Sequence, residues 1–81
     1  MKELSVTITR LESHHDGIVV GTKVTFKVYQ GGKLLLADTV YGKATTPYSR
    51  TYEVDASDEV LLIVEHDRAD LPWLNITTSF L

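Results

Sequence analysis

The sequence of 81 residues contains no cysteine, which excludes a disulfide framework and a zinc site built on thiolates. Its longest apolar run, Val60 to Val64, is far shorter than the roughly 20 residues of a membrane-spanning helix. No stretch has the apolar spacing of an amphipathic helix, and the amino terminus lacks the apolar core of a signal peptide. We therefore expect a soluble, cytoplasmic protein without helices.

Length and composition predict one globular domain, residues 1–81. Hydrophobic residues make up 43% of the chain and charged residues 23%, a balance that argues against disorder. A chain of this length buries about 60–65% of the surface that its unfolded form exposes. We expect it to fold alone, with little stability to spare.

The pattern that is present is an alternation of apolar and polar residues with a period of two, as in half-buried β-strands. Its apolar phase runs through four segments: Leu4, Val6 and Ile8; Val24, Phe26 and Val28; Tyr48, Tyr52 and Val54; and Leu74, Ile76 and Phe80. Two short runs, Leu34 to Ala37 and Val60 to Val64, are apolar on both faces and are interpreted as further strands. The predicted core is Val6, Ile8, Val24, Phe26, Val28, Tyr52, Leu62, Val64 and Ile76.

Turn signals arrange these strands into an all-β fold. Gly31-Gly32 predicts a tight hairpin, and the polar segment Asp55 to Asp58 predicts another turn. The result is six strands, or seven if Ile18 to Val20 also pairs. We predict a small antiparallel β-sandwich.

Three long connections, at about residues 12–21, 41–47 and 67–73, alternate with the two short turns. Since each connection between antiparallel strands reverses the chain, the long ones should share one end of the molecule. Binding residues often lie on loops held by a rigid scaffold. The predicted binding residues at this loop end are His14, His15, Asp16, Tyr41, Lys43, His66, Asp67, Asp70 and Trp73.

Two kinds of chemical site can be written from these residues. The run His14-His15-Asp16 invites a metal interpretation, but the spacing of the histidines matches no zinc pattern, and they fit equally as turn residues. Ser49, His66 and Asp67 supply the groups of a hydrolase, without a nucleophile elbow or a glycine-rich phosphate loop. We expect no metal, no cofactor and no enzymatic activity.

Charge is unevenly placed along the chain. Residues 22–50 carry five basic side chains and one acidic, whereas residues 51–81 carry seven acidic and one basic. Two solvated surfaces, or a dimer that pairs unlike faces, fit this division. No dense basic cluster interleaved with aromatic residues is present, so nucleic acid is not an expected partner.

The order of motifs resembles the C-two domains, calcium- and phospholipid-binding β-sandwiches. The similar segments are Leu4-Ser-Val-Thr-Ile8, Asp16-Gly17, Thr46-Pro47 through Val54, and Leu61 through Asp67. The chain departs from that family at functional positions. Thr22-Lys23 replaces an aspartate-bearing strand start, His66 and Arg68 replace an acidic pair, and Ser49-Arg50 replaces a Trp-Asn pair.

The resemblance implies an alternative function, a peripheral membrane or metal-binding module like a reduced C-two domain. In this alternative Lys23 and Lys27 attract an anionic leaflet, and Trp73 inserts at its surface. Equally, Trp73 can plug an open end of the sandwich with its large apolar ring.

The function predicted first is a non-catalytic binding or assembly module, which acts through the loop end or an exposed strand edge. The segments Leu4 to Thr9 and Leu74 to Leu81 have no charged side chain and no proline, the usual protections of an edge. Either segment, if it lies at an edge, should be covered by another chain. The expected partner is a protein or a second copy, and the expected state is a homo-oligomer.

Overall fold

The computed structural model describes residues 1–42, 46–58 and 61–81, and these ranges contain strands and no helix. The strands are β1 (Lys2–Thr9), β2 (Ser13–His15), β3 (Ile18–Val20), β4 (Thr22–Gln30), β5 (Lys33–Gly42), β6 (Tyr48–Val54), β7 (Ile63–His66) and β8 (Asn75–Phe80). All the pairings between them are antiparallel. The all-β class is confirmed. No described segment forms a helix able to cross a membrane.

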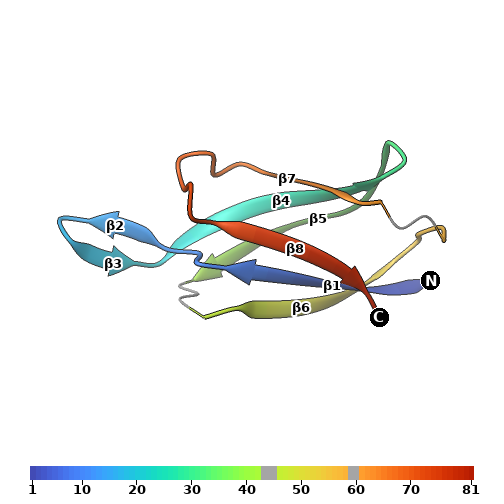
Figure 1. Ribbon diagram of the computed structural model, residues 1–81, viewed down its shortest axis with the longest axis horizontal. Helices are drawn as coiled ribbons and strands as arrows, with labels where there is room; N and C mark the ends of the chain where they lie inside the picture. The colour runs from blue at the N-terminus through green and yellow to red at the C-terminus, as the bar shows by residue number, and fades with distance from the viewer. Residues whose placement is uncertain (43–45, 59–60) are drawn as a thin grey trace.

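Two three-stranded sheets form the body of the molecule, with strand orders β6-β1-β8 and β5-β4-β7. The hairpin β2–β3 forms a separate two-stranded sheet that extends from one end (Figure 1). The Phe26 ring of β4 meets the Tyr52 ring of β6 edge-on at 6.3 Å, which places the sheets face to face. The molecule is elongated, with extents of 45 × 21 × 16 Å.

The core lies between the two central strands, β1 and β4. The inward side chains of β1 and β4 are almost fully buried: Leu4, Val6, Ile8, Val24, Phe26 and Val28. Five of the nine predicted core residues are in this set, and the other four, Tyr52, Leu62, Val64 and Ile76, are half-buried against it. The alternation therefore predicts correctly which face of these strands is buried.

Two strand predictions were wrong in detail. The described residues form eight strands: Ile18–Val20 pairs, as the seven-strand alternative allowed, and its partner Ser13–His15 is a strand where a loop was predicted. The strand predicted at residues 60–64 is β7, Ile63–His66, since its polar end pairs with β4 through Glu65 and His66. Val60 itself lies outside the described residues.

The opening strand is not an edge. β1 pairs with β6 on one side and β8 on the other, so Val6 lies between Arg50 and Thr78. Its lack of charge is explained by this central place, where both sides of the backbone are bonded and the inward face is buried. The terminal strand β8 is an edge, because β1 is its one neighbour in the described sheet.

The acidic and basic halves of the sequence do not form two opposed faces. Lys33 of the basic half makes an ion pair with Asp55 of the acidic half, and Lys27 lies directly opposite Glu65 in the sheet. The sheet topology mixes the two halves because β4 pairs with β7. These basic and acidic side chains are therefore adjacent within one copy and are not divided between two faces.

Candidate functional site

The loop end contains the β2–β3 hairpin, the β7–β8 connection and the end of β5, as predicted (Figure 1). Both termini lie at the opposite end, next to the short β4–β5 turn. The free edge of β8 runs between these two ends. The loop end and this edge are the two candidate binding surfaces predicted from the sequence.

The β2–β3 hairpin turns at Asp16 and Gly17, which both have positive φ, 50° and 78°. A two-residue turn with positive φ at both positions matches the right-handed twist of the flanking strands, and Asp-Gly is one of its preferred sequences. His15, Asp16 and the 64%-exposed Ile18 lie at its tip. Of the residues that suggested a metal site, Asp16 thus forms the turn, and His14 and His15 belong to β2.

Trp73 fixes the base of this hairpin. Its ring stacks on His14 with a centroid distance of 4.8 Å and an interplanar angle of 26°. Its Nε1 donates a 3.0 Å hydrogen bond to the carbonyl oxygen of Glu12, and the Arg10 guanidinium lies 6.0 Å from the ring centroid. Trp73 therefore closes the loop end of the sandwich, one of the two roles considered for it.

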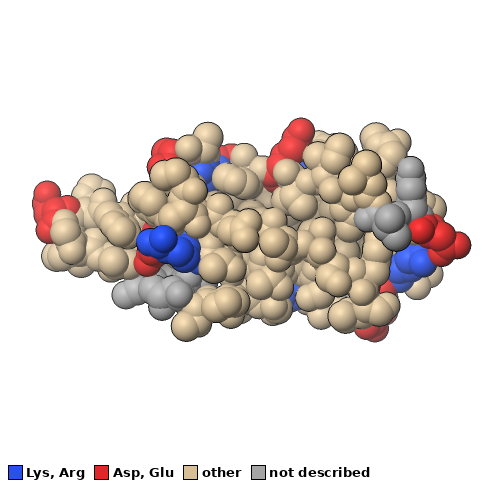
Figure 2. Space-filling model, viewed as in Figure 1, with Lys and Arg blue, Asp and Glu red and all other residues tan. Residues whose placement is uncertain are grey.

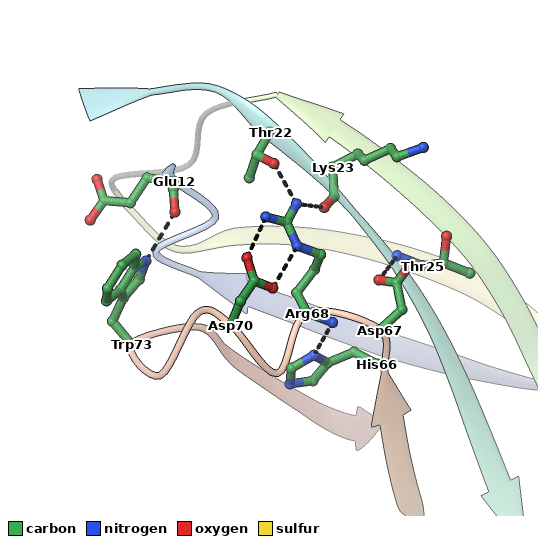
Figure 3. Close-up of polar contacts among 9 residues, drawn as sticks. All are labelled: Glu12, Thr22, Lys23, Thr25, His66, Asp67, Arg68, Asp70 and Trp73. Atoms are coloured by element: carbon green, nitrogen blue, oxygen red, sulfur yellow. Dashed lines mark hydrogen bonds and ion pairs between the residues drawn. The ribbon is translucent and has the colours of Figure 1, made fainter. Parts of the chain in front are cut away.

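Arg68 holds the β7–β8 connection against β4 (Figure 3). Its guanidinium donates two 3.0 Å bonds to the Asp70 carboxylate, and further bonds to the Thr22 hydroxyl and to the Lys23 carbonyl at 2.8 Å. The bond from Arg68 holds the pKa of the Asp70 carboxyl below its usual value. Asp70 is thus engaged within the fold. Sequence reasoning missed Arg68, although it is the one basic residue of its half of the chain.

The neighbouring residues of this connection are also partly engaged. The Asp67 side chain accepts a 2.9 Å hydrogen bond from the Thr25 N–H, and its own N–H donates to the Thr25 carbonyl at 3.1 Å. His66 Nδ1 accepts a bond from the Arg68 N–H. A shallow hollow of about 300 Å³ lies beside them, lined by Thr25, Lys27, Glu65, His66 and Asp67. Its size is at the lower limit for a small-molecule site.

Among the nine predicted binding residues, the contacts within the fold fall into two groups. His14 and Trp73 contact each other at the hairpin base, whereas His66 ends β7 and Asp67 and Asp70 follow it. Tyr41 is 74% exposed at the end of β5, and Lys43 lies outside the described residues. In residues 1–42, 46–58 and 61–81, no three His, Asp or Glu side chains are grouped to hold a metal ion.

The edge formed by β5 and β6 is closed by inward-pointing charges. Asp38 of β5 accepts a 2.6 Å hydrogen bond from the Tyr52 hydroxyl and a 3.1 Å bond from Arg50, both on β6. Arg50 lies beside the buried Val6 in the inward phase of its strand. Inward-pointing charges of this kind protect an edge, because an added strand would have to desolvate them.

These contacts perturb two acidic groups. The hydrogen bond from Tyr52, with those from the Thr39 N–H and Arg50, holds the pKa of Asp38 below its usual value of 3.8. Burial and the bond to Asp38 raise the pKa of Tyr52 to about 12. The stability that Asp38 contributes is present above its unfolded-state pKa and lost as pH falls through the lower folded-state pKa.

Replacing Tyr52 with phenylalanine should raise the pKa of Asp38 toward 3.8, because the carboxylate loses its principal donor. Titration of the side-chain carboxyl ¹³C signals by NMR measures it directly. Asp58, whose pKa is lowered by Lys2 at the opposite end, is the internal control and should not move. An unchanged Asp38 pKa in the variant would contradict this account of the β5–β6 edge.

The strand β8 carries no such charge of its own, and the charge recorded beside it is Lys2 of β1, whose Nζ lies 5.7 Å from the centroid of the Phe80 ring. The strands at the other three edges of the two sheets, β5, β6 and β7, carry Asp38, Arg50 and Glu65, whereas Asn75–Phe80 has no charged side chain. Ile76 and Phe80 are half-buried, and they lie inward on the side of the sandwich away from the Asp38 contacts.

The backbone of β8 offers hydrogen-bonding groups to solvent. Leu81 N donates to the Glu3 carbonyl at 3.0 Å, which continues the β1–β8 ladder by one residue. Opposed residues in an antiparallel ladder alternate between bonded and non-bonded pairs. Asn75, Thr77 and Ser79 therefore bond to β1, and the N–H and C=O groups of Ile76, Thr78 and Phe80 point outward.

The outer face of this sheet is also uncharged over most of its length. Figure 2 shows the charged side chains at the ends and margins of this view, with none in its centre. Small polar residues oppose one another across the three strands: Ser5, Thr7 and Thr9 on β1, Ser49 and Thr51 on β6, and Asn75, Thr77 and Ser79 on β8. Glu3 and Glu53 are the exception on this face, and they oppose each other near the end with the termini.

Comparison with known proteins finds no family model that matches the chain, no curated protein that matches its sequence, and no solved structure that matches it.

Proposed function

We propose that this protein is a non-catalytic assembly module, which associates with another copy of itself by adding a strand to the free edge of β8. The observation that carries the proposal is the difference between edges. Asp38 and Arg50 protect β5 and β6, whereas β8 is uncharged and has three residues whose backbone groups point outward. An unprotected edge is a template for strand addition, in which main-chain bonds supply affinity.

The loop end is less well suited to be the main binding surface. Its largest side chain, Trp73, is packed on the hairpin, and Asp67 and Asp70 are used in hydrogen bonds within the fold. A reduced C-two module would need cation ligands or an aromatic ring free to insert into lipid. The engaged Trp73 and the lack of grouped metal ligands in the described residues favour the edge instead.

Replacing Thr78 with lysine should abolish association while the domain stays folded. Thr78 and Arg50 flank Val6 on opposite sides, so the lysine gives β8 the same kind of inward charge that protects β6. A lysine stem can reach solvent from an edge position, so the fold tolerates it. Light scattering across the micromolar range should show association of the unmodified chain and a monomer of about 9.1 kDa for Thr78→Lys.

The matched control is Thr51→Lys, which adds the same charge to the exposed outer face of β6. This variant should associate as the unmodified chain does, and circular dichroism should show both variants folded. The proposal fails if the unmodified chain is monomeric at high micromolar concentration. It also fails if Thr78→Lys associates as strongly as Thr51→Lys.

A further inference from the structure

This inference rests on the proposed assembly. The unprotected edge of β8 does not by itself determine which strand of the second copy pairs with it. β8 could add to the edge of β5, β6, β7 or β8 of another copy. A contact between two unlike edges is heterologous, and it leaves each copy with a free edge for further addition. A contact of β8 with itself is two-fold and closed. The residues of β8 decide between these arrangements.

Three of the four candidate edges are unfavourable partners. The inward phase of β5 and β6 contains Asp38 and Arg50, which would be desolvated beside the apolar inward side chains of β8. β7 has four residues and includes Glu65 and His66. Only β8 offers a strand of matching length with no charge on either face.

We infer that β8 pairs antiparallel with β8 of a second copy, about a two-fold axis through Thr78. The outward backbone groups belong to Ile76, Thr78 and Phe80, so a centre at Thr78 brings all three into register. Thr78 of one copy then lies opposite Thr78 of the other, and Ile76 lies opposite Phe80 of the second copy. Each of these pairs exchanges both N–H···O bonds, as opposed residues do in an antiparallel ladder.

Side chains on both faces are compatible with this register. On the inward face a β-branched Ile76 meets an aromatic Phe80, a favourable cross-strand pair. On the outer face Thr77 meets Ser79, so no charges are opposed. Ile76 and Phe80 are half-buried in one copy, and the second copy would cover the side on which they lie.

The resulting sheet would have the order β6-β1-β8-β8-β1-β6, with protected β6 strands at both outer edges. The assembly therefore stops at two copies instead of growing into a fibre. One strand edge is smaller than a standard interface of about 1,600 Å². Association in the micromolar range is expected, which is why concentration must be varied in the tests.

Single cysteines test the register, because the chain has no thiol of its own. In the proposed dimer the two Thr78 Cα atoms are about 5.5 Å apart, within the range of a disulfide. The two Thr77 Cα atoms are offset along the strands, at roughly 7–8 Å, and are too far apart to be bridged without backbone movement. Thr51→Cys on β6 measures random collision between exposed thiols.

Under mild oxidation at high micromolar concentration, Thr78→Cys should form a covalent dimer at least tenfold faster than Thr77→Cys or Thr51→Cys. Equal or faster cross-linking of Thr77→Cys would overturn the Thr78 axis. If Thr78→Cys does not cross-link although association is still abolished by Thr78→Lys, β8 pairs with another strand, and this inference alone fails. A monomeric unmodified chain would overturn the proposed function as well.

Discussion

Replacing Phe26 with alanine should destabilise the domain by about 3–5 kcal/mol, the range measured for large-to-small changes of buried aromatic residues. Phe26 has no exposed surface and lies on the central strand β4, where it also contacts the Tyr52 ring of the opposite sheet. A domain of this size has a total stability of about 5–15 kcal/mol or less. Urea unfolding followed by circular dichroism should show a much lower midpoint or a largely unfolded chain.

Tyr41→Ala is the matched control, since it removes an aromatic ring that is 74% exposed at the end of β5. Its effect should stay within about 0.5 kcal/mol, as for other surface changes. Equal effects of the two substitutions would mean that Phe26 is not in the core. The inward and outward faces of β4 would then be reversed.

Replacing Trp73 with alanine should have the second largest effect, about 2–3 kcal/mol. This value lies at or below the lower limit for buried tryptophan, because the ring is only half-buried. The stack on His14 and the bond to the Glu12 carbonyl are lost together. Amide hydrogen exchange should accelerate in the hairpin, residues 13–20, more than in β1.

Trp73→Phe separates the two contributions, because it retains an aromatic ring beside His14 and removes the Nε1 donor. Loss of that hydrogen bond alone should cost about 1 kcal/mol. Hairpin exchange that is unchanged in both variants would show that Trp73 does not anchor the hairpin. Its ring would then be available for a partner at the loop end.

The sequence predicts well the parts of the fold that depend on local alternation. Val24, Phe26 and Val28 alternate with polar residues, and they are buried as a face of β4 because successive side chains point to opposite sides of a strand. The position of the long connections at one end also follows from strand reversal alone. Neither inference needs to know which strands are neighbours.

Two local features were predictable and were missed. Asp16-Gly17 is a strong two-residue hairpin signal, whereas the adjacent histidines suggest a loop with metal ligands. The start of β7 was predicted too early because the apolar run Val60 to Val64 suggested it. The residues that pair with β4 are Ile63 to His66, so the strand extends into the polar residues Glu65 and His66.

A lack of charge does not by itself identify an edge strand in the sequence, because it has two opposite causes. Leu4 to Thr9 of β1 is uncharged because both sides of the strand are covered, whereas β8 is uncharged with one side free. A protected edge leaves a more direct signal, a charged residue in the inward phase of a strand. Arg50 stands in the inward phase between Tyr48 and Tyr52, as Asp38 does between Leu36 and Val40.

Amide hydrogen exchange of β8, measured residue by residue at low and high micromolar concentration, tests strand addition at this edge most directly. The N–H groups of Thr77 and Ser79 bond to β1 and should be protected at both concentrations. The outward N–H groups of Ile76, Thr78 and Phe80 should exchange rapidly when dilute and become protected as concentration rises. Rapid exchange of these three amides at every concentration would contradict the assembly of this protein through β8.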